Sequence, residues 1–535
     1  MMKYRRLLLV VATYLWGASL VHAGDARIGR YVEYDAGEFR IITSRSGTQA
    51  RQFVEDLAKF RVTLEKSLGR RASRTVFPTT IIISSTADWN KYLIPRQNVA
   101  GFFQQAHFAN FMAMNGDAPR EESVHTVLHE YTHFYLATQF AGEYPPWFNE
   151  GLAELMGLAV FTKENMAVLQ IPLYHIYTLR ERDWIPFERL IKVSMNDPEY
   201  RSHKLADNFY AQSWLTVHYG LVENRAFGGQ MMKYLNEMNS LHTQTESSRT
   251  AFGEDLGAID KQLREYSRST RMSSGGIKIG ETTPVTLAAG KPVEPTDAMA
   301  ILVDVMLESR FHPDRIRPLV QTIEKKEPNA ARSAILAARL AQLEDDNTAF
   351  DLATARAEGL LAAADWLQRR ELATVLLSTA SEFNPMSKRS GAQNDRDLKR
   401  AMKWFGEAIQ HNGKDIEALW GFGTAATELG ENLDLAEEAL LSAYQRAPGN
   451  ADIAISLSNI KNRREKPDEM IPYLMDAIRY ASNNDARRWA VETLDRTQKY
   501  IIERDRNEAE YQKQREDYDK TVAEYEKKYG KKKKK

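Results

Sequence analysis

Hydrophobic and polar residues alternate with two different periods in the first part of the chain. Spacing typical of strands predicts β-structure at residues 31–44, 76–84, 101–104 and 108–114, and helical spacing predicts a helix at residues 49–68. The run TTIII at 79–83 is typical of a strand that is buried on both faces. We therefore expect a small sheet before the longer helices begin.

A helix at about residues 121–139 has its own apolar stripe. Its members follow the spacing i, i+3, i+4, i+7 and i+11 and are Val124, Val127, Leu128, Tyr131 and Tyr135. The two prolines at 145–146 end this segment and start a second helix, because proline suits the first helical turn. Helical patterns continue to about residue 267, so the first part of the chain is predicted to be α+β.

From residue 297 to about residue 500 nearly every segment is helical, and the helices repeat. Three segments align so that Ala408, Ala443 and Ala477 occupy equivalent positions, 35 and 34 residues apart. This period is typical of tetratricopeptide repeats, helix–turn–helix units that stack on their neighbours. The copies at 297–380 are less regular, and a helical bundle without repeats is the alternative.

Two further segments flank the repeats. Residues 269–296 are dense in Gly, Pro, Ser and Thr, so we expect an interdomain linker or a small connecting hairpin. Residues 501–535 form a charged tail in which Tyr511, Tyr518 and Tyr525 are seven residues apart, a weak heptad seam. We expect a solvated helix that ends in a polylysine run at 531–535.

The N-terminus has the pattern of an export signal. Lys3, Arg5 and Arg6 precede an apolar run at 7–20, and VHA at 21–23 places small residues where a signal peptidase inspects the chain. Residues 1–23 are therefore predicted to be a signal peptide. The alternative is an uncleaved anchor that holds the protein in the inner membrane, facing the periplasm.

Composition limits the remaining possibilities. With 535 residues the chain is too long for one hydrophobic core. Lys+Arg and Asp+Glu both number 72, so no overall field favours nucleic acid. The absence of cysteine excludes disulfides and thiolate metal sites, and it fits a periplasmic location. Apart from the N-terminus, no stretch is apolar enough to span a bilayer, so we expect membrane contact to be peripheral at most.

Candidate chemistry lies in the helix at 121–139 and in the one that follows. The sequence HEYTH at 129–133 is an H-E-x-x-H motif, and residues i and i+4 lie on the same face of a helix. Two imidazoles at this spacing can bind one metal ion, and the Glu between them can act on a metal-bound water. The following helix brings an acidic residue, Glu150, with 16 residues between it and His133.

The block PPWFNEGLAE at 145–154 and the later YAQSW at 210–214 resemble a known family. With the H-E-x-x-H motif they are similar to gluzincin metallopeptidases of the peptidase MA clan, in particular to bacterial exported peptidase-MA-like domains that end in tetratricopeptide repeats. The resemblance covers roughly residues 30–265 and, more loosely, the repeats. It implies an α+β zincin-like metallopeptidase domain at 24–268, an all-α tetratricopeptide-repeat solenoid at 297–500, and zinc held by His129, His133 and Glu150.

In this interpretation the chain is an exported zinc metallopeptidase that hydrolyses peptide bonds. Glu130 is the expected general base, which takes a proton from the zinc-activated water and passes it to the leaving amine. Glu154 could accept a hydrogen bond from a ligand histidine, or be ordinary helix-surface charge. Tyr210 could stabilise the oxyanion, or be a core tyrosine. The strand at 108–114 could pair with an extended substrate.

Other aspects of the function stay open. The spacer before Glu150 is shorter than in the aminopeptidase branch, and the Gly-x-Met-Glu-Asn signature is missing, so aminopeptidase specificity is not implied. The repeats are expected to bind a protein substrate or partner. The alternatives are an interaction scaffold with a vestigial metallopeptidase domain, and a domain in which the metal is structural.

Overall fold

A computed structural model of the chain describes residues 25–37, 39–69, 79–93, 101–106, 108–139, 144–240, 242–280, 287–361, 365–379, 390–481 and 484–529. The predicted signal peptide at 1–23 and the polylysine run at 531–535 lie outside the described residues. A search of the described helices finds none with the length and apolar character needed to cross a membrane.

The first part of the chain is built on a six-stranded sheet with the order β4-β5-β3-β2-β1-β9. Strand β3 pairs in parallel with both β2 and β5. The other pairs, β4 with β5, β1 with β2 and β1 with β9, are antiparallel. Every residue of β3 is buried, which confirms the prediction from its β-branched run. The strands are β1 (Tyr31–Asp35), β2 (Phe39–Thr43), β3 (Thr79–Ser84), β4 (Gly101–Gln105), β5 (Asn110–Asn115) and β9 (Lys291–Val293).

Two strand predictions need correction. The segment 31–44 is not one strand but a hairpin of β1 and β2, because Gly37 adopts a φ of 78° at the turn between them. The predicted substrate-pairing strand at 108–114 corresponds to β5, which is already paired with β3 on one side and β4 on the other. The edge strands of the sheet are β4 and β9, so an added strand could pair with these and not with β5.

Helices and a second small sheet complete this part. In α3 (Arg120–Gln139) four members of the predicted apolar stripe, Val127, Leu128, Tyr131 and Tyr135, are buried, and the fifth, Val124, is half-buried. A three-stranded sheet has the order β6-β7-β8 and consists of β6 (Ala159–Phe161), β7 (Met166–Leu169) and β8 (Gly275–Lys278). The helical elements are α1 (Gly47–Leu68), α2 (Thr86–Asp88), η1 (Trp89–Leu93), α3 (Arg120–Gln139), α4 (Pro146–Gly157), α5 (Leu173–Glu181), α6 (Phe187–Leu190), α7 (Pro198–Arg201), α8 (His203–His218), η2 (Tyr219–Glu223), α9 (Arg225–Asn239), α10 (Gln244–Phe252) and α11 (Leu256–Ser267).

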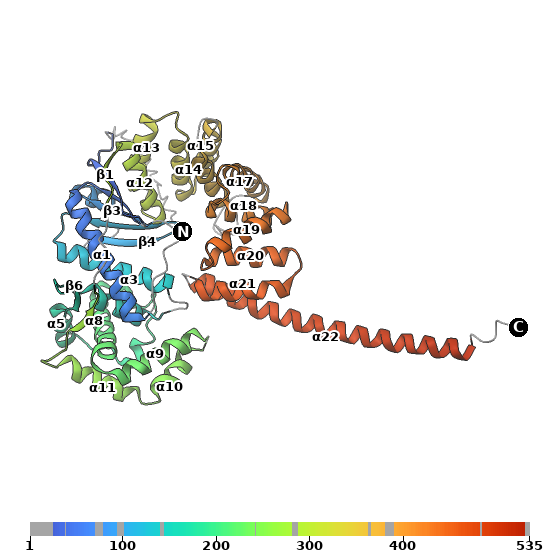
Figure 1. The fold of residues 1–535 in the computed structure, drawn as a ribbon, viewed down its shortest axis with the longest axis horizontal. Coiled ribbons are helices and arrows are strands. Elements are labelled where there is room, and N and C mark those ends of the chain that lie inside the picture. Colours follow the sequence, from blue (N-terminus) through green and yellow to red (C-terminus); the bar gives the residue numbers. More distant parts are fainter. Residues whose placement is uncertain are drawn as a thin grey trace, which may run out of the picture.

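The second part is an all-helical repeat region that forms an arc beside the sheet (Figure 1). Ala408, Ala443 and Ala477 lie in α17, α19 and α21 and are each 0% exposed, so the sequence repeat corresponds to equivalent packing positions. The helices are α12 (Pro295–Glu308), α13 (Pro313–Lys326), α14 (Ala331–Leu343), α15 (Asn347–Leu360), α16 (Trp366–Leu377), α17 (Gly391–His411), α18 (Ile416–Leu429), α19 (Leu433–Arg446), α20 (Ala451–Arg463), α21 (Pro467–Tyr480) and α22 (Asn484–Tyr529).

The segment 269–296 does more than connect the two parts. Its two short strands do not pair with each other: β8 pairs with β7 in the small sheet and β9 pairs with β1 in the large one. The first repeat helices then share a core with the sheet, in which Met306 and Ile316 join Ile82 and Phe102. A second contact between the parts is made by Phe108, whose ring centroid lies 5.0 Å from that of Trp420 in α18.

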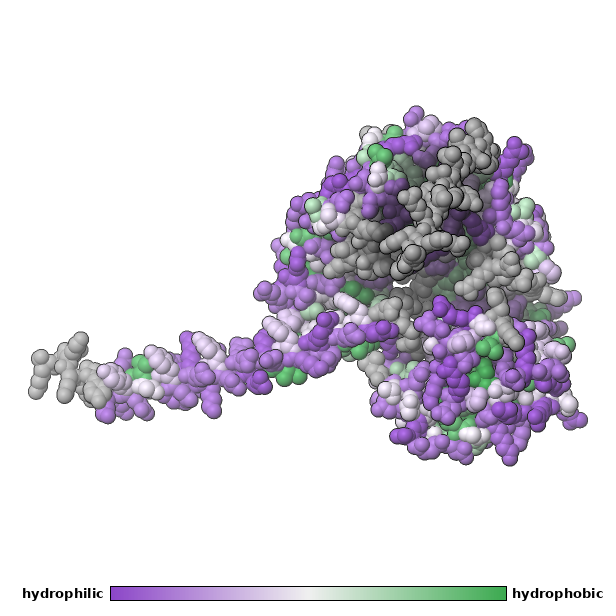
Figure 2. All heavy atoms as spheres, turned by 180° about the vertical axis from the view of Figure 1, so that it is seen from behind, coloured by the Kyte–Doolittle hydropathy of each residue, from purple (hydrophilic) through white to green (hydrophobic). Residues whose placement is uncertain are grey.

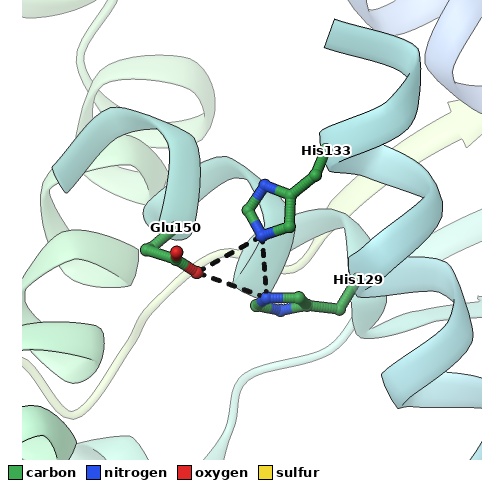
Figure 3. Close-up of side chains that lie close together, drawn as sticks. All are labelled: His129, His133 and Glu150. Atoms are coloured by element: carbon green, nitrogen blue, oxygen red, sulfur yellow. Dashed lines mark hydrogen bonds and ion pairs between the residues drawn. The ribbon is translucent and has the colours of Figure 1, made fainter. Parts of the chain in front are cut away.

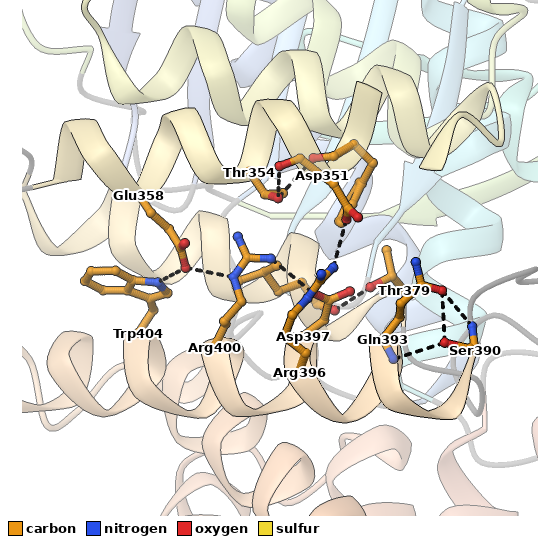
Figure 4. Close-up of polar contacts among 12 residues, drawn as sticks. Asp351, Thr354, Glu358, Thr379, Ser390, Gln393, Arg396, Asp397, Arg400 and Trp404 are labelled. Atoms are coloured by element: carbon orange, nitrogen blue, oxygen red, sulfur yellow. Dashed lines mark hydrogen bonds and ion pairs between the residues drawn. The ribbon is translucent and has the colours of Figure 1, made fainter. Parts of the chain in front are cut away.

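Charged side chains also join neighbouring repeat helices (Figure 4). Asp397 in α17 is 0% exposed and lies 3.0 Å from Arg400. Arg400 also forms an ion pair with Glu358 in α15 at 2.9 Å. The same Glu358 oxygen accepts a hydrogen bond from the Trp404 indole. Because each charge is paired, the network links α15 to α17 without leaving an isolated ion in the interior.

The tail is the end of one long helix, α22, which projects from the body of the molecule (Figures 1 and 2). Tyr511, Tyr518 and Tyr525 are 62%, 69% and 65% exposed. The predicted solvated, charged helix is therefore observed.

Candidate metal centre

Two helices bring the predicted site residues together (Figure 3). His129 and His133 project from successive turns of α3, and Glu150 projects toward them from α4. The Nε2 atoms of the two histidines are 3.1 Å apart, and Glu150 Oε2 lies 3.3 Å from the first and 3.4 Å from the second. Within the described residues, these three are the group of His, Asp and Glu side chains whose ligand atoms all lie within 4.8 Å of one another.

Glycines at two positions set where α4 lies. A Cβ atom on Gly151 would lie 2.3 Å from the backbone oxygen of Ser213, so α4 contacts the backbone of α8 at this point. Gly151 is therefore a point of close helix packing beside Glu150. At the other end of α4, a Cβ on Gly157 would lie 3.2 to 3.3 Å from His125 and His129. The absence of side chains here lets α4 approach both α8 and the histidine face of α3.

The second nitrogen of each histidine faces an acceptor. His133 Nδ1 lies 3.0 Å from Asn149 Oδ1, and His129 Nδ1 lies 3.3 Å from Glu154 Oε1. Donation from Nδ1 selects the neutral tautomer in which Nε2 carries a lone pair. Both Nε2 lone pairs then face each other and Glu150, an arrangement that a cation between them would stabilise.

The surroundings of Glu150 also indicate a cation site. Its side chain is 6% exposed, and Oε1 accepts a hydrogen bond of 2.8 Å from the Tyr200 hydroxyl. Oε2 is buried, makes no well-formed hydrogen bond within the described residues, and contacts the two imidazole nitrogens at 3.3 and 3.4 Å. A buried carboxylate oxygen without a well-formed hydrogen bond is costly unless a cation contacts it. Two imidazole nitrogens and one carboxylate oxygen are a donor set that fits Zn²⁺.

The electrostatics of the pocket favour positive charge. Burial raises the pKa of the Glu150 carboxyl, but the imidazoles of His133 and His129 outweigh burial and hold that pKa well below its usual range. Burial lowers the pKa of His129, while the carboxylates of Glu150 and Glu154 raise it, and the net shift is upward. The Glu150 and Glu154 carboxylates therefore favour positive charge at the imidazoles, which either protons or a metal ion can supply.

Glu154 lies where it can orient His129. Besides the contact with His129, its Oε2 lies 2.9 Å from His175 Nε2 on α5, and its side chain is 13% exposed. His125 is more distant, with Nε2 3.8 Å from the same oxygen. Glu154 is thus part of a buried chain of polar groups and is not an ordinary surface charge.

Glu130 and Tyr210 lie beside the three converging groups and are not among them. Glu130 follows His129 on α3; burial raises the pKa of its carboxyl, and the charges of His129 and His133 offset only part of that rise. Tyr210 lies on α8 with its ring centroid 6.2 Å from that of Tyr200. Burial and the negative charge of Glu150 raise the pKa of the Tyr210 hydroxyl.

Sequence reasoning missed three groups around the site: Asn149, His175 and Tyr200. Asn149 adjoins Glu150 in the block at 145–154, and its place one residue before a predicted ligand could have indicated a role. His175 and Tyr200 lie in α5 and in the four-residue α7, and no spacing in the sequence connects either residue with the H-E-x-x-H motif.

The chain can be compared with protein-family models, curated proteins and solved structures. No protein-family model matches the chain, and no curated protein matches it. Among solved structures the chain is similar to YrrB, a TPR protein with an unusual peptide-binding site, at 16% identity over 36% of this chain and 90% of that chain, with a TM-score of 0.27. It is also similar to yeast Tom70, at 12% identity over 70% of each chain, with a TM-score of 0.29. The repeat architecture accordingly rests on the arrangement of the chain's own helices.

Proposed function

We propose that the chain is an exported zinc metallopeptidase whose helical repeats bind a protein substrate or partner. The observation that carries the proposal is the convergence of His129 Nε2, His133 Nε2 and the buried Glu150 Oε2, whose ligand atoms lie within 4.8 Å of one another. Export rests on the pattern of residues 1–23 alone.

The residues of the site divide into three roles. His129, His133 and Glu150 would hold the zinc, with Glu154 and Asn149 fixing the imidazole orientations. Zinc supplies a Lewis acid that polarises a carbonyl and lowers the pKa of a water. Glu130, whose carboxyl pKa is raised by burial, would accept the proton of the attacking water and deliver it to the leaving amine. Tyr210 would donate a hydrogen bond to the developing oxyanion and keep its own proton.

A second candidate is an interaction scaffold in which the metal site is inactive. A cavity of about 540 Å³ lies between α18, α20 and α22 and is lined by residues that include Trp420, Asn459 and Trp489. Aromatic and amide side chains in a groove suit an extended polypeptide. This candidate needs only the observed repeat architecture, whereas hydrolysis also needs the metal.

Metal removal distinguishes the two candidates. We expect purified protein to cleave an unfolded substrate such as casein, to lose this activity on dialysis against 1,10-phenanthroline, and to regain it with one equivalent of zinc but not with magnesium, whose preferred ligands are oxygens. The His133→Ala variant is the control that added zinc should not restore. Cleavage by metal-free protein would contradict a zinc peptidase, and an inactive zinc-loaded wild type would favour the scaffold.

A further inference from the structure

The two oxygens of Glu150 have different surroundings, and one tyrosine makes the difference. Oε1 accepts a hydrogen bond of 2.8 Å from the hydroxyl of Tyr200, whereas Oε2 faces both histidines and makes no well-formed hydrogen bond within the described residues. A carboxylate with both oxygens free can bind a metal through one oxygen or through both. A hydrogen bond to one oxygen leaves the other oxygen as the one that binds the metal.

The structure holds Tyr200 rigidly from two sides. Its ring packs against Phe209 and Tyr210 of α8, with centroids 5.8 Å and 6.2 Å away. The four-residue helix α7 that carries it is too short to be stable alone. Arg189 of α6 fixes α7 by contacting both carboxylate oxygens of Glu199, at 2.8 and 2.9 Å.

We propose that Tyr200 is a positioning residue that occupies Oε1 of Glu150 and so reserves Oε2 for the zinc ion. The inference rests on the metal site of the proposed function but not on its catalytic activity. It also separates two neighbouring tyrosines: Tyr200 acts on the ligand Glu150, and Tyr210 acts on the substrate.

The test is the zinc affinity of Tyr200→Phe, measured by competition with a chromophoric chelator. Losing a hydrogen-bonded partner of a metal ligand typically weakens binding about 10–100-fold, and we expect a loss in this range. Tyr234→Phe is the matched control, because it removes another buried hydroxyl, 3.5 Å from a backbone oxygen of Ile191. We expect its zinc affinity to equal that of the wild type.

A second readout separates positioning from a general loss of packing. In cobalt-substituted protein, a free Oε1 in Tyr200→Phe can also bind the ion, which raises the coordination number and weakens the visible absorption of cobalt. Wild-type zinc affinity and an unchanged cobalt spectrum in Tyr200→Phe would overturn the inference. Zinc binding by the wild type without cleavage of any protein would instead count against the proposed function alone.

Discussion

Replacing Glu130 by Gln is expected to lower kcat/KM for protein cleavage by about 10²–10⁴-fold, the range typical of a lost general base. Gln has the shape of Glu but cannot accept the proton of the attacking water. Because Glu130 is not among the three converging groups, the variant should retain its full zinc content. The measurement is the rate of casein cleavage together with zinc content, both determined on the same preparation.

The matched control is Glu164→Gln, which neutralises an exposed carboxylate in the turn between β6 and β7. We expect this variant to cleave casein at the wild-type rate. If Glu130→Gln cleaved as fast as the wild type, or if it lost zinc together with activity, the role of Glu130 as a general base would be wrong.

A methyl group at Gly151 is expected to destabilise the protein and to weaken its metal site. The Cβ of Gly151→Ala would lie 2.3 Å from the Ser213 backbone oxygen and 2.7 Å from a Val217 methyl, and a backbone oxygen in a packed helix cannot rotate away. Overpacking of this kind costs about 1–3 kcal/mol. Since α4 must shift away from α8, Glu150 moves with it, and zinc affinity should fall as well. Urea unfolding followed by tryptophan fluorescence and a zinc titration measure the two effects.

Gly229→Ala provides the comparison. Gly229 lies within α9, and a Cβ there would meet no atom within 4 Å. Alanine is favoured over glycine inside a helix by up to about 1 kcal/mol, so this variant should be slightly more stable than the wild type. Equal stability of Gly151→Ala and wild type would contradict the packing of α4 against α8.

The part of the site that sequence could predict is the part encoded by local spacing. The i, i+4 rule places His129 and His133 on one face of α3, and Pro145 and Pro146 mark the start of the helix that carries Glu150. Tyr200 could not be found in this way, because it is 50 residues from Glu150 and belongs to a single helical turn without periodicity.

The same distinction applies to the fold. The buried β3 and the helices of the repeats have strong local patterns, and the structure contains them. The pairing of β9 with β1 joins segments about 260 residues apart, and β8 and β9 are too short for a pattern to assign either one to its sheet. Strand order places β4 and β9 at the edges of the sheet and β5 inside it, and no pattern within residues 108–114 encodes that order.

The most direct test of the central claim is an anomalous difference map, measured at the zinc absorption edge from crystals of the purified protein. We predict one strong peak between His129, His133 and Glu150, about 2.0–2.2 Å from each of the two Nε2 atoms and from Oε2. A map with no peak in this pocket after growth and purification in the presence of zinc, or with its main peak elsewhere, would contradict the metal centre.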